Sequence, residues 1–128
     1  MKLFEPYTIN NKLNLTNRIM MPPVVTRLAT EQGHVTDALI DRYLLYARGG
    51  SGIVVTEAIS VKKQKSGQLL RLNDDEYVPG LKELTKRVHE ETDAKIAPQI
   101  LHFLKIVKGN SVIFDSLSSK QRLSWFGL

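Results

Sequence analysis

Apolar residues recur along the middle of the chain at two different spacings, one typical of helices and one of strands. Residues 36–48 carry apolar side chains at helical spacing, with Thr36 as the expected N-cap and Gly49-Gly50 as the stop. Residues 53–56 form a continuous β-branched run, which is typical of a strand buried on both faces of a parallel sheet. This order predicts the αβ half of a βαβ unit. The helical positions expected to be buried are Leu39, Ile40, Tyr43, Leu44 and Ala47.

The alternation continues toward the C-terminus. Segment 60–73 is polar and is expected to be a long loop. Pro79 fits the first turn of a second helix, whose buried face would carry Leu81, Leu84 and Val88. Residues 95–101 are expected to form a third strand, in which Pro98 predicts a bulge or a strand edge because proline cannot donate a ladder hydrogen bond.

Shorter elements are expected at the two ends of the chain. Two apolar stretches around Asn10-Asn11-Lys12 predict a hairpin, because asparagine tolerates the left-handed conformations of tight turns. Residues 18–21 predict a short strand, which Pro22-Pro23 would end, and a loop follows. Beyond residue 104 the pattern fades, although Ser116 and Ser118 could each cap a short helix.

The resulting order of hairpin, β, α, β, α, β allows two α/β architectures, a doubly wound sheet and a (β/α)₈ barrel. No G-x-G-x-x-G motif follows the first strand, so the dinucleotide-binding sheet loses support. The hairpin fits a barrel, whose bottom it could plug. A complete barrel needs about 250 residues and eight strands, whereas these 128 residues show about three strands, so we expect about the first three β/α units.

Composition and charge narrow the classes of function. The sequence has no cysteine, which excludes disulfides and thiolate metal sites and fits a cytoplasmic protein. Its three histidines are scattered, so we expect no metal site. The net charge is +5, but the densest basic cluster, Lys62, Lys63 and Lys65, has no interleaved aromatic residue, so we expect no nucleic-acid partner. No apolar run approaches the roughly 20 residues of a membrane span.

Three blocks of the sequence match one known family in order and spacing. They read LFEPYTINNKLNLTNRIMMPPVVTRLA (3–29), GHVTDALIDRYLLYARGGSGIVVTEAISV (33–61) and LNDDEYVPGLKELTKRVHEETDAKIAPQILHF (72–103). Together they resemble the old yellow enzyme family, and most closely its branch of 2,4-dienoyl-CoA reductase and related NADH:flavin oxidoreductases. The resemblance implies a partial (β/α)₈ TIM barrel that binds FMN at the C-terminal mouth of its strands. It also implies hydride transfer from NADH or NADPH through the flavin to an activated alkene or enoyl substrate.

The resemblance assigns site residues at the ends of the three strands. By this resemblance the cofactor-binding residues are Pro22, Pro23, Val24, Val25, Ala58 and Gln99. Arg27 would lie on the substrate side, where it could meet an acidic substrate or a cofactor phosphate; a solvated loop arginine is the alternative. Val25 stands where the family often has a Thr or Cys that tunes the flavin, and Thr26 could substitute. Glu57 could be a general base or a side chain in the barrel wall. No catalytic residue is assigned.

Two hypotheses of function follow. We expect residues 1–104 to form the N-terminal part of an FMN-binding barrel and residues 105–128 to form a divergent tail, as in a truncated or frameshifted gene product. The chain would then be an incomplete FMN-dependent ene reductase. The alternative is a non-catalytic partial barrel that self-associates or binds a partner chain. Because a partial barrel exposes open strand edges, we expect a homo-oligomer or a complex with a complementary fragment.

Overall fold

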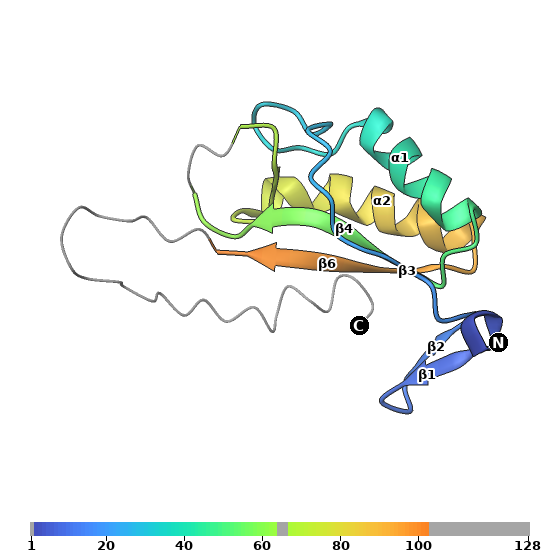
Figure 1. The fold of residues 1–128 in the computed structure, drawn as a ribbon. Coiled ribbons are helices and arrows are strands. Elements are labelled where there is room, and N and C mark those ends of the chain that lie inside the picture. The colour runs from blue at the N-terminus through green and yellow to red at the C-terminus, as the bar shows by residue number, and fades with distance from the viewer. Residues whose placement is uncertain (1, 64–66, 103–128) are drawn as a thin grey trace.

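The computed structural model describes residues 2–63 and 67–102, in which two helices cover one face of a parallel sheet (Figure 1). The expected tail at 105–128 and its short helix lie outside the described residues. A short 3₁₀ turn, η1 (Lys2–Phe4), precedes the first strand.

The N-terminal hairpin is confirmed. Strands β1 (Tyr7–Ile9) and β2 (Leu13–Leu15) pair in antiparallel fashion, with Tyr7 opposite Leu15. Asn10 and Asn11 both adopt left-handed backbone conformations, with φ values of 50° and 55°, as the turn requires. The guanidinium carbon of Arg18 lies 4.4 Å from the centre of the Tyr7 ring. The hairpin lies beyond one end of the parallel sheet (Figure 1).

The three predicted strands are parallel neighbours. Strand β4 (Ile53–Ser60) lies between β3 (Met20–Met21) and β6 (Lys95–Leu101). The prediction that segment 60–73 is entirely loop is wrong. Within it, β5 (Leu70–Arg71) pairs with the end of β4, with Ile59 opposite Leu70. Strand β4 runs to Ser60, where it pairs with both β5 and β6, so the expectation that Ala58 ends the strand is wrong.

Both helices form where their amphipathic patterns predict. Helix α1 (Asp37–Arg48) begins at Thr36, whose hydroxyl oxygen accepts the Leu39 N–H at 3.2 Å. All five positions predicted to be buried in this helix are buried. A 3₁₀ turn, η2 (Asp75–Tyr77), leads into α2 (Val78–Glu91), and Pro79 lies in the first turn of α2.

The hydrophobic core lies between the helices and the sheet. Its largest contributors from the strands are Val54, Ile59, Leu70 and Ile96, which pack with the buried faces of α1 and α2. The two helices are also joined at their C-terminal ends by an ion pair between Arg48 and Glu91. Arg87 contacts the same carboxylate, with its Nε 2.7 Å from Glu91 Oε1.

A β-bulge interrupts β4 opposite Pro98, as the proline predicted. Val55 pairs with Ala97 and Ala58 with Gln99, so two residues of β4 face one residue of β6. Pro98 has no N–H to donate, which explains why the ladder breaks there. The Glu57 N–H donates instead to the Tyr43 hydroxyl oxygen at 2.6 Å.

Candidate functional site

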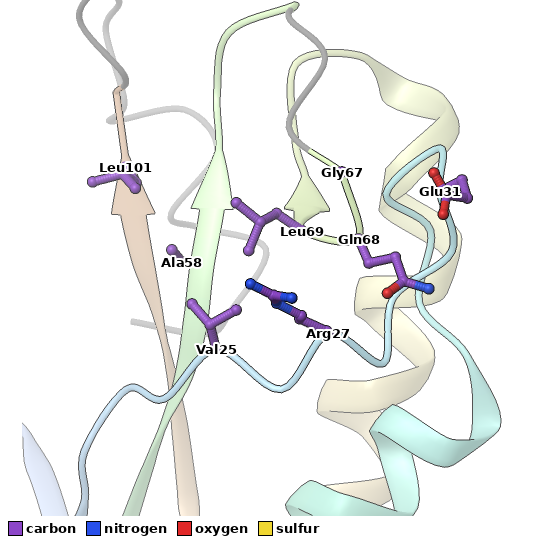
Figure 2. Close-up of a pocket in the computed structure, with 8 residues that line it drawn as sticks. All are labelled: Val25, Arg27, Glu31, Ala58, Gly67, Gln68, Leu69 and Leu101. Atoms are coloured by element: carbon purple, nitrogen blue, oxygen red, sulfur yellow. The ribbon is translucent and has the colours of Figure 1, made fainter.

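A cavity of about 650 Å³ lies at the carboxyl ends of β4 and β6 (Figure 2). In α/β barrels this end of the strands carries the active site. The loop after β3, the strands β4 and β6, and the segment before β5 all contribute to the pocket. Its lining residues are Val25, Arg27, Glu31, Ala58, Gly67, Gln68, Leu69 and Leu101.

The pocket brings together three of the residues predicted from the sequence. Val25 and Arg27 come from the loop after β3, and Ala58 is buried in β4. Gln99 does not line the pocket, but it is the cross-strand partner of Ala58 and is exposed. The roles assigned to these residues stay predictions.

The remaining predicted residues precede the pocket along the chain. Pro22, Pro23 and Val24 do not line it; Pro22 is exposed and Pro23 is half-buried. Val24 is 51% exposed and Val25 is 48% exposed, so two consecutive large apolar side chains lie at the surface. These two valines therefore offer an apolar strip beside the pocket.

Sequence reasoning missed the other five of the eight lining residues. Glu31, Gln68 and Leu69 lie in polar segments that carry no helical or strand periodicity. Leu101 was placed on the third strand but was not linked to a site. The only sequence signal for these positions is that they follow the ends of strands, where loops of a parallel sheet converge.

Glu57 is completely buried and contacts the loop that carries Val25 and Arg27. Its Oε2 accepts the Thr26 N–H at 2.8 Å and the Thr26 hydroxyl at 2.5 Å. The Thr26 Oγ1 in turn accepts the Leu28 N–H at 3.1 Å. Within the described residues, Glu57 Oε1 is buried and has no hydrogen-bond partner. Glu57 was expected to be either a general base or a side chain in the barrel wall. These contacts favour the structural role, in which Glu57 anchors the loop after β3.

Tyr43, on helix α1, accepts a hydrogen bond from the Glu57 backbone. Its side chain is 2% exposed, and burial raises the pKa of its phenol well above the usual value of 10.0. The buried hydroxyl therefore keeps its proton to a higher pH than an ordinary phenol, and its oxygen accepts the Glu57 N–H.

Arg27 is the one cation among the described residues that line the pocket. Its backbone is left-handed, with a φ of 58°, although it is not glycine. Its side chain extends from the loop toward β4, between Val25 and Leu69 (Figure 2). It forms no hydrogen bond or ion pair with any residue in the described ranges 2–63 and 67–102.

Residues 2–63 and 67–102 hold neither a metal-binding cluster nor a membrane-spanning helix. In these ranges no group of three or more His, Asp or Glu side chains converges on a point where a metal ion could bind. No helix there is long and apolar enough to cross a membrane.

Comparison with known proteins gives one family. The model of the NADH:flavin oxidoreductase / NADH oxidase family matches residues 2–121. An NADH oxidase of Thermoanaerobacter brockii is 44% identical over 103 residues, which cover 78% of this chain and 16% of that protein. An NADPH dehydrogenase of Clostridium acetobutylicum is 34% identical over 113 residues, which cover 87% of this chain and 33% of that protein. The chain thus spans a third or less of these two relatives.

Solved structures show the fold. An old yellow enzyme homologue from Zymomonas mobilis superposes with a TM-score of 0.73 at 23% identity, covering 84% of this chain and 30% of that chain. A 2-naphthoyl-CoA reductase in complex with 2-naphthoyl-CoA gives a TM-score of 0.71 at 28% identity, covering 79% of this chain and 16% of that chain. The predicted α/β fold, a partial (β/α)₈ barrel with an N-terminal hairpin, is therefore confirmed.

The matched sequence, the parallel sheet and the position of the pocket all agree. The chain belongs to the NADH:flavin oxidoreductase / NADH oxidase family, of the old yellow enzyme type, and corresponds to its N-terminal portion.

Proposed function

We propose that the pocket forms one side of an FMN site in an NAD(P)H-dependent ene reductase. The observation that carries this proposal is the convergence of Val25, Arg27 and Ala58 at the carboxyl ends of parallel strands. Ligands of barrel enzymes bind at this end. The names of the relatives, an NADH oxidase and an NADPH dehydrogenase, support a nicotinamide as hydride donor and leave NADH and NADPH both open.

The residues present fit a flat, partly apolar cofactor. Ala58 is small and would let a ring approach the β4 backbone, while Val25 and Leu69 would pack against its apolar surface. The exposed Gln99, beside Ala58 on β6, would offer amide donors and an acceptor to the mixed polar edge of a flavin. Pro22, Pro23 and Val24 would extend the wall.

When bound, FMN would supply the redox chemistry by carrying a hydride from the nicotinamide to the β-carbon of an activated alkene. The chain's own residues would hold and orient the reactants. The apolar lining would exclude water from the reacting atoms, and Arg27 would face the substrate. We propose a small activated alkene or enoyl compound as substrate, and a cytoplasmic location, which the cysteine-free sequence fits.

FMN titration of the purified protein tests the proposal. Ala58→Leu would fill the pocket beside β4, and Gln99→Ala would remove the amide from an exposed position. We expect each to weaken FMN binding at least tenfold, as followed by quenching of flavin fluorescence. Ala38→Leu on the exposed face of α1 is the matched control and should leave the affinity unchanged.

Two outcomes would contradict the proposed site. The first is wild-type protein that binds no FMN, and the second is equal FMN affinity in all three variants. Circular dichroism must show that Ala58→Leu is folded, because Ala58 is buried. Oxidation of NADPH and NADH with 2-cyclohexenone, a neutral activated alkene, then measures turnover and the nicotinamide preference.

A second candidate is a non-catalytic partial barrel that self-associates or binds a complementary chain. It is favoured by one observation: among the described strands, β6 pairs only with β4, which leaves its other edge open. Met20, 56% exposed, adds apolar surface on the sheet. Sedimentation velocity would support this candidate if the protein is oligomeric and binds no FMN, whereas a monomer that binds FMN would argue against it.

A further inference from the structure

We infer that Arg27 forms an anion subsite in the pocket, which takes a carboxylate or phosphate of the bound ligand, and that Thr26 and Glu57 position it. The inference rests on the proposed function, because it names the chemistry of the ligand that the same pocket receives.

The first step is the charge of the pocket. Apolar side chains make up much of the lining, and Arg27 is the only cation among the lining residues that the structure describes. In Figure 2 the guanidinium reaches toward Ala58 and lies between Val25 and Leu69, while Glu31 lies farther from β4. Within the described residues no acid pairs with Arg27. An arginine with apolar neighbours and open hydrogen-bond donors favours an oxyanion, which it can bind in a bidentate manner.

The second step is the backbone of Arg27. A left-handed φ is uncommon for a residue with a side chain and persists where the surroundings hold it. Here both neighbours of Arg27 are tied to one hydroxyl group. The Thr26 Oγ1 donates to the buried Glu57 Oε2 and accepts the Leu28 N–H. The turn is therefore fixed on both sides of Arg27.

The third step is the anchor of this turn. Glu57 accepts two hydrogen bonds from Thr26 and is itself held in the bulge of β4 by the Tyr43 hydroxyl. The bulge thus connects the helix layer to the loop over the pocket. This arrangement holds an exposed arginine at a set place beside Ala58. A freely solvated arginine would need no such support.

The oxyanion could belong to the alkene substrate or to a cofactor phosphate, and paired probes separate these sources. Isothermal titration calorimetry would compare cinnamate with methyl cinnamate, and FMN with riboflavin. The proteins are the wild type, Arg27→Gln, Thr26→Val and, as a matched control, Arg42→Gln on the exposed face of α1. Thr26→Val keeps the side-chain shape and removes the hydroxyl that links Glu57 to Leu28.

We expect Arg27→Gln to weaken the binding of the charged member of one pair at least tenfold and of its neutral partner less than twofold. If Arg27→Gln loses affinity for cinnamate alone, the subsite binds the carboxylate of the substrate. If it loses affinity for FMN alone, the subsite binds the cofactor phosphate. Thr26→Val should reduce the same charged-to-neutral ratio about threefold or more while its thermal unfolding stays cooperative. Arg42→Gln should change neither ratio.

The inference is overturned if wild-type protein shows no preference for either charged probe. It is also overturned if Arg27→Gln weakens charged and neutral probes equally. An unchanged ratio in Thr26→Val would refute the positioning role. Failure of the proposed function looks different, because it would appear as absent flavin binding or absent reduction of 2-cyclohexenone, neither of which enters the cinnamate comparison.

Discussion

Replacement of Tyr43 by phenylalanine tests how the bulge of β4 is stabilised. The Tyr43 hydroxyl oxygen accepts the Glu57 N–H at 2.6 Å, and Glu57 is fully buried. The variant keeps the ring and therefore opens no large cavity. It leaves a buried backbone donor without its acceptor, which costs about 1–3 kcal/mol. We expect the free energy of unfolding to fall by that amount.

Urea denaturation followed by far-UV circular dichroism measures this loss. Since small domains lose about 1–3 kcal/mol of stability per molar urea, the midpoint should fall by on the order of 1 M. Tyr46→Phe is the control on the same helix, because Tyr46 is only half-buried; it should change the stability by less than about 0.5 kcal/mol. If Tyr43→Phe is no less stable than Tyr46→Phe, the hydroxyl does not stabilise the bulge.

Three other perturbations have expected outcomes. Burial raises the pKa of Tyr43, so the folded state keeps a proton that the unfolded state loses near pH 10.0. The free energy of unfolding should therefore fall above pH 10.0 by up to about 1.4 kcal/mol per pH unit. In Tyr43→Phe this fall should be less steep. A parallel pH dependence would contradict this assignment. Arg27→Gly should leave the protein as stable or more stable by about 1 kcal/mol, because it relieves a left-handed φ, whereas Arg42→Gly inside α1 should cost about 1 kcal/mol; equal melting temperatures of the two would count against strain at Arg27. Gly52→Ala should cost about 1–3 kcal/mol, because the new Cβ would lie 2.6 Å from the Asn17 carbonyl oxygen, and an unchanged urea midpoint would show that the backbone there yields easily.

The helices could be predicted because their information is local. In α1 the Thr36 cap and the apolar spacing gave the start and the buried face of the helix, and both agree with the structure. Pro98 likewise predicted the bulge, because a missing N–H affects its own ladder position directly. Features of this kind depend on residues within one or two turns of each other.

The strand β5 and the loop anchor could not be predicted in this way. Leu70 and Arg71 form two residues of strand inside a polar segment, which is too short for a periodic pattern, and they pair because Leu70 packs into the core. Thr26 and Glu57 are separated by 31 residues, and nothing near either residue indicates its partner. Five of the eight pocket-lining residues were missed for the same reason, since loops that meet above a sheet carry no sequence pattern that pairs them.

The bulge opposite Pro98 also constrains how the length of this segment can change. Val54 and Ile59 both pack into the core, although simple alternation over an odd separation would place them on opposite faces. If β4 kept its length but had no bulge, Ala58 would turn toward the helices and Ile59 toward the pocket. The extra residue of the bulge shifts the alternation of inward and outward side chains along β4 by one position. Deleting Glu57 would therefore straighten β4 and leave Ala58 and Ile59 on their present faces, but it would remove the carboxylate that accepts both hydrogen bonds from Thr26.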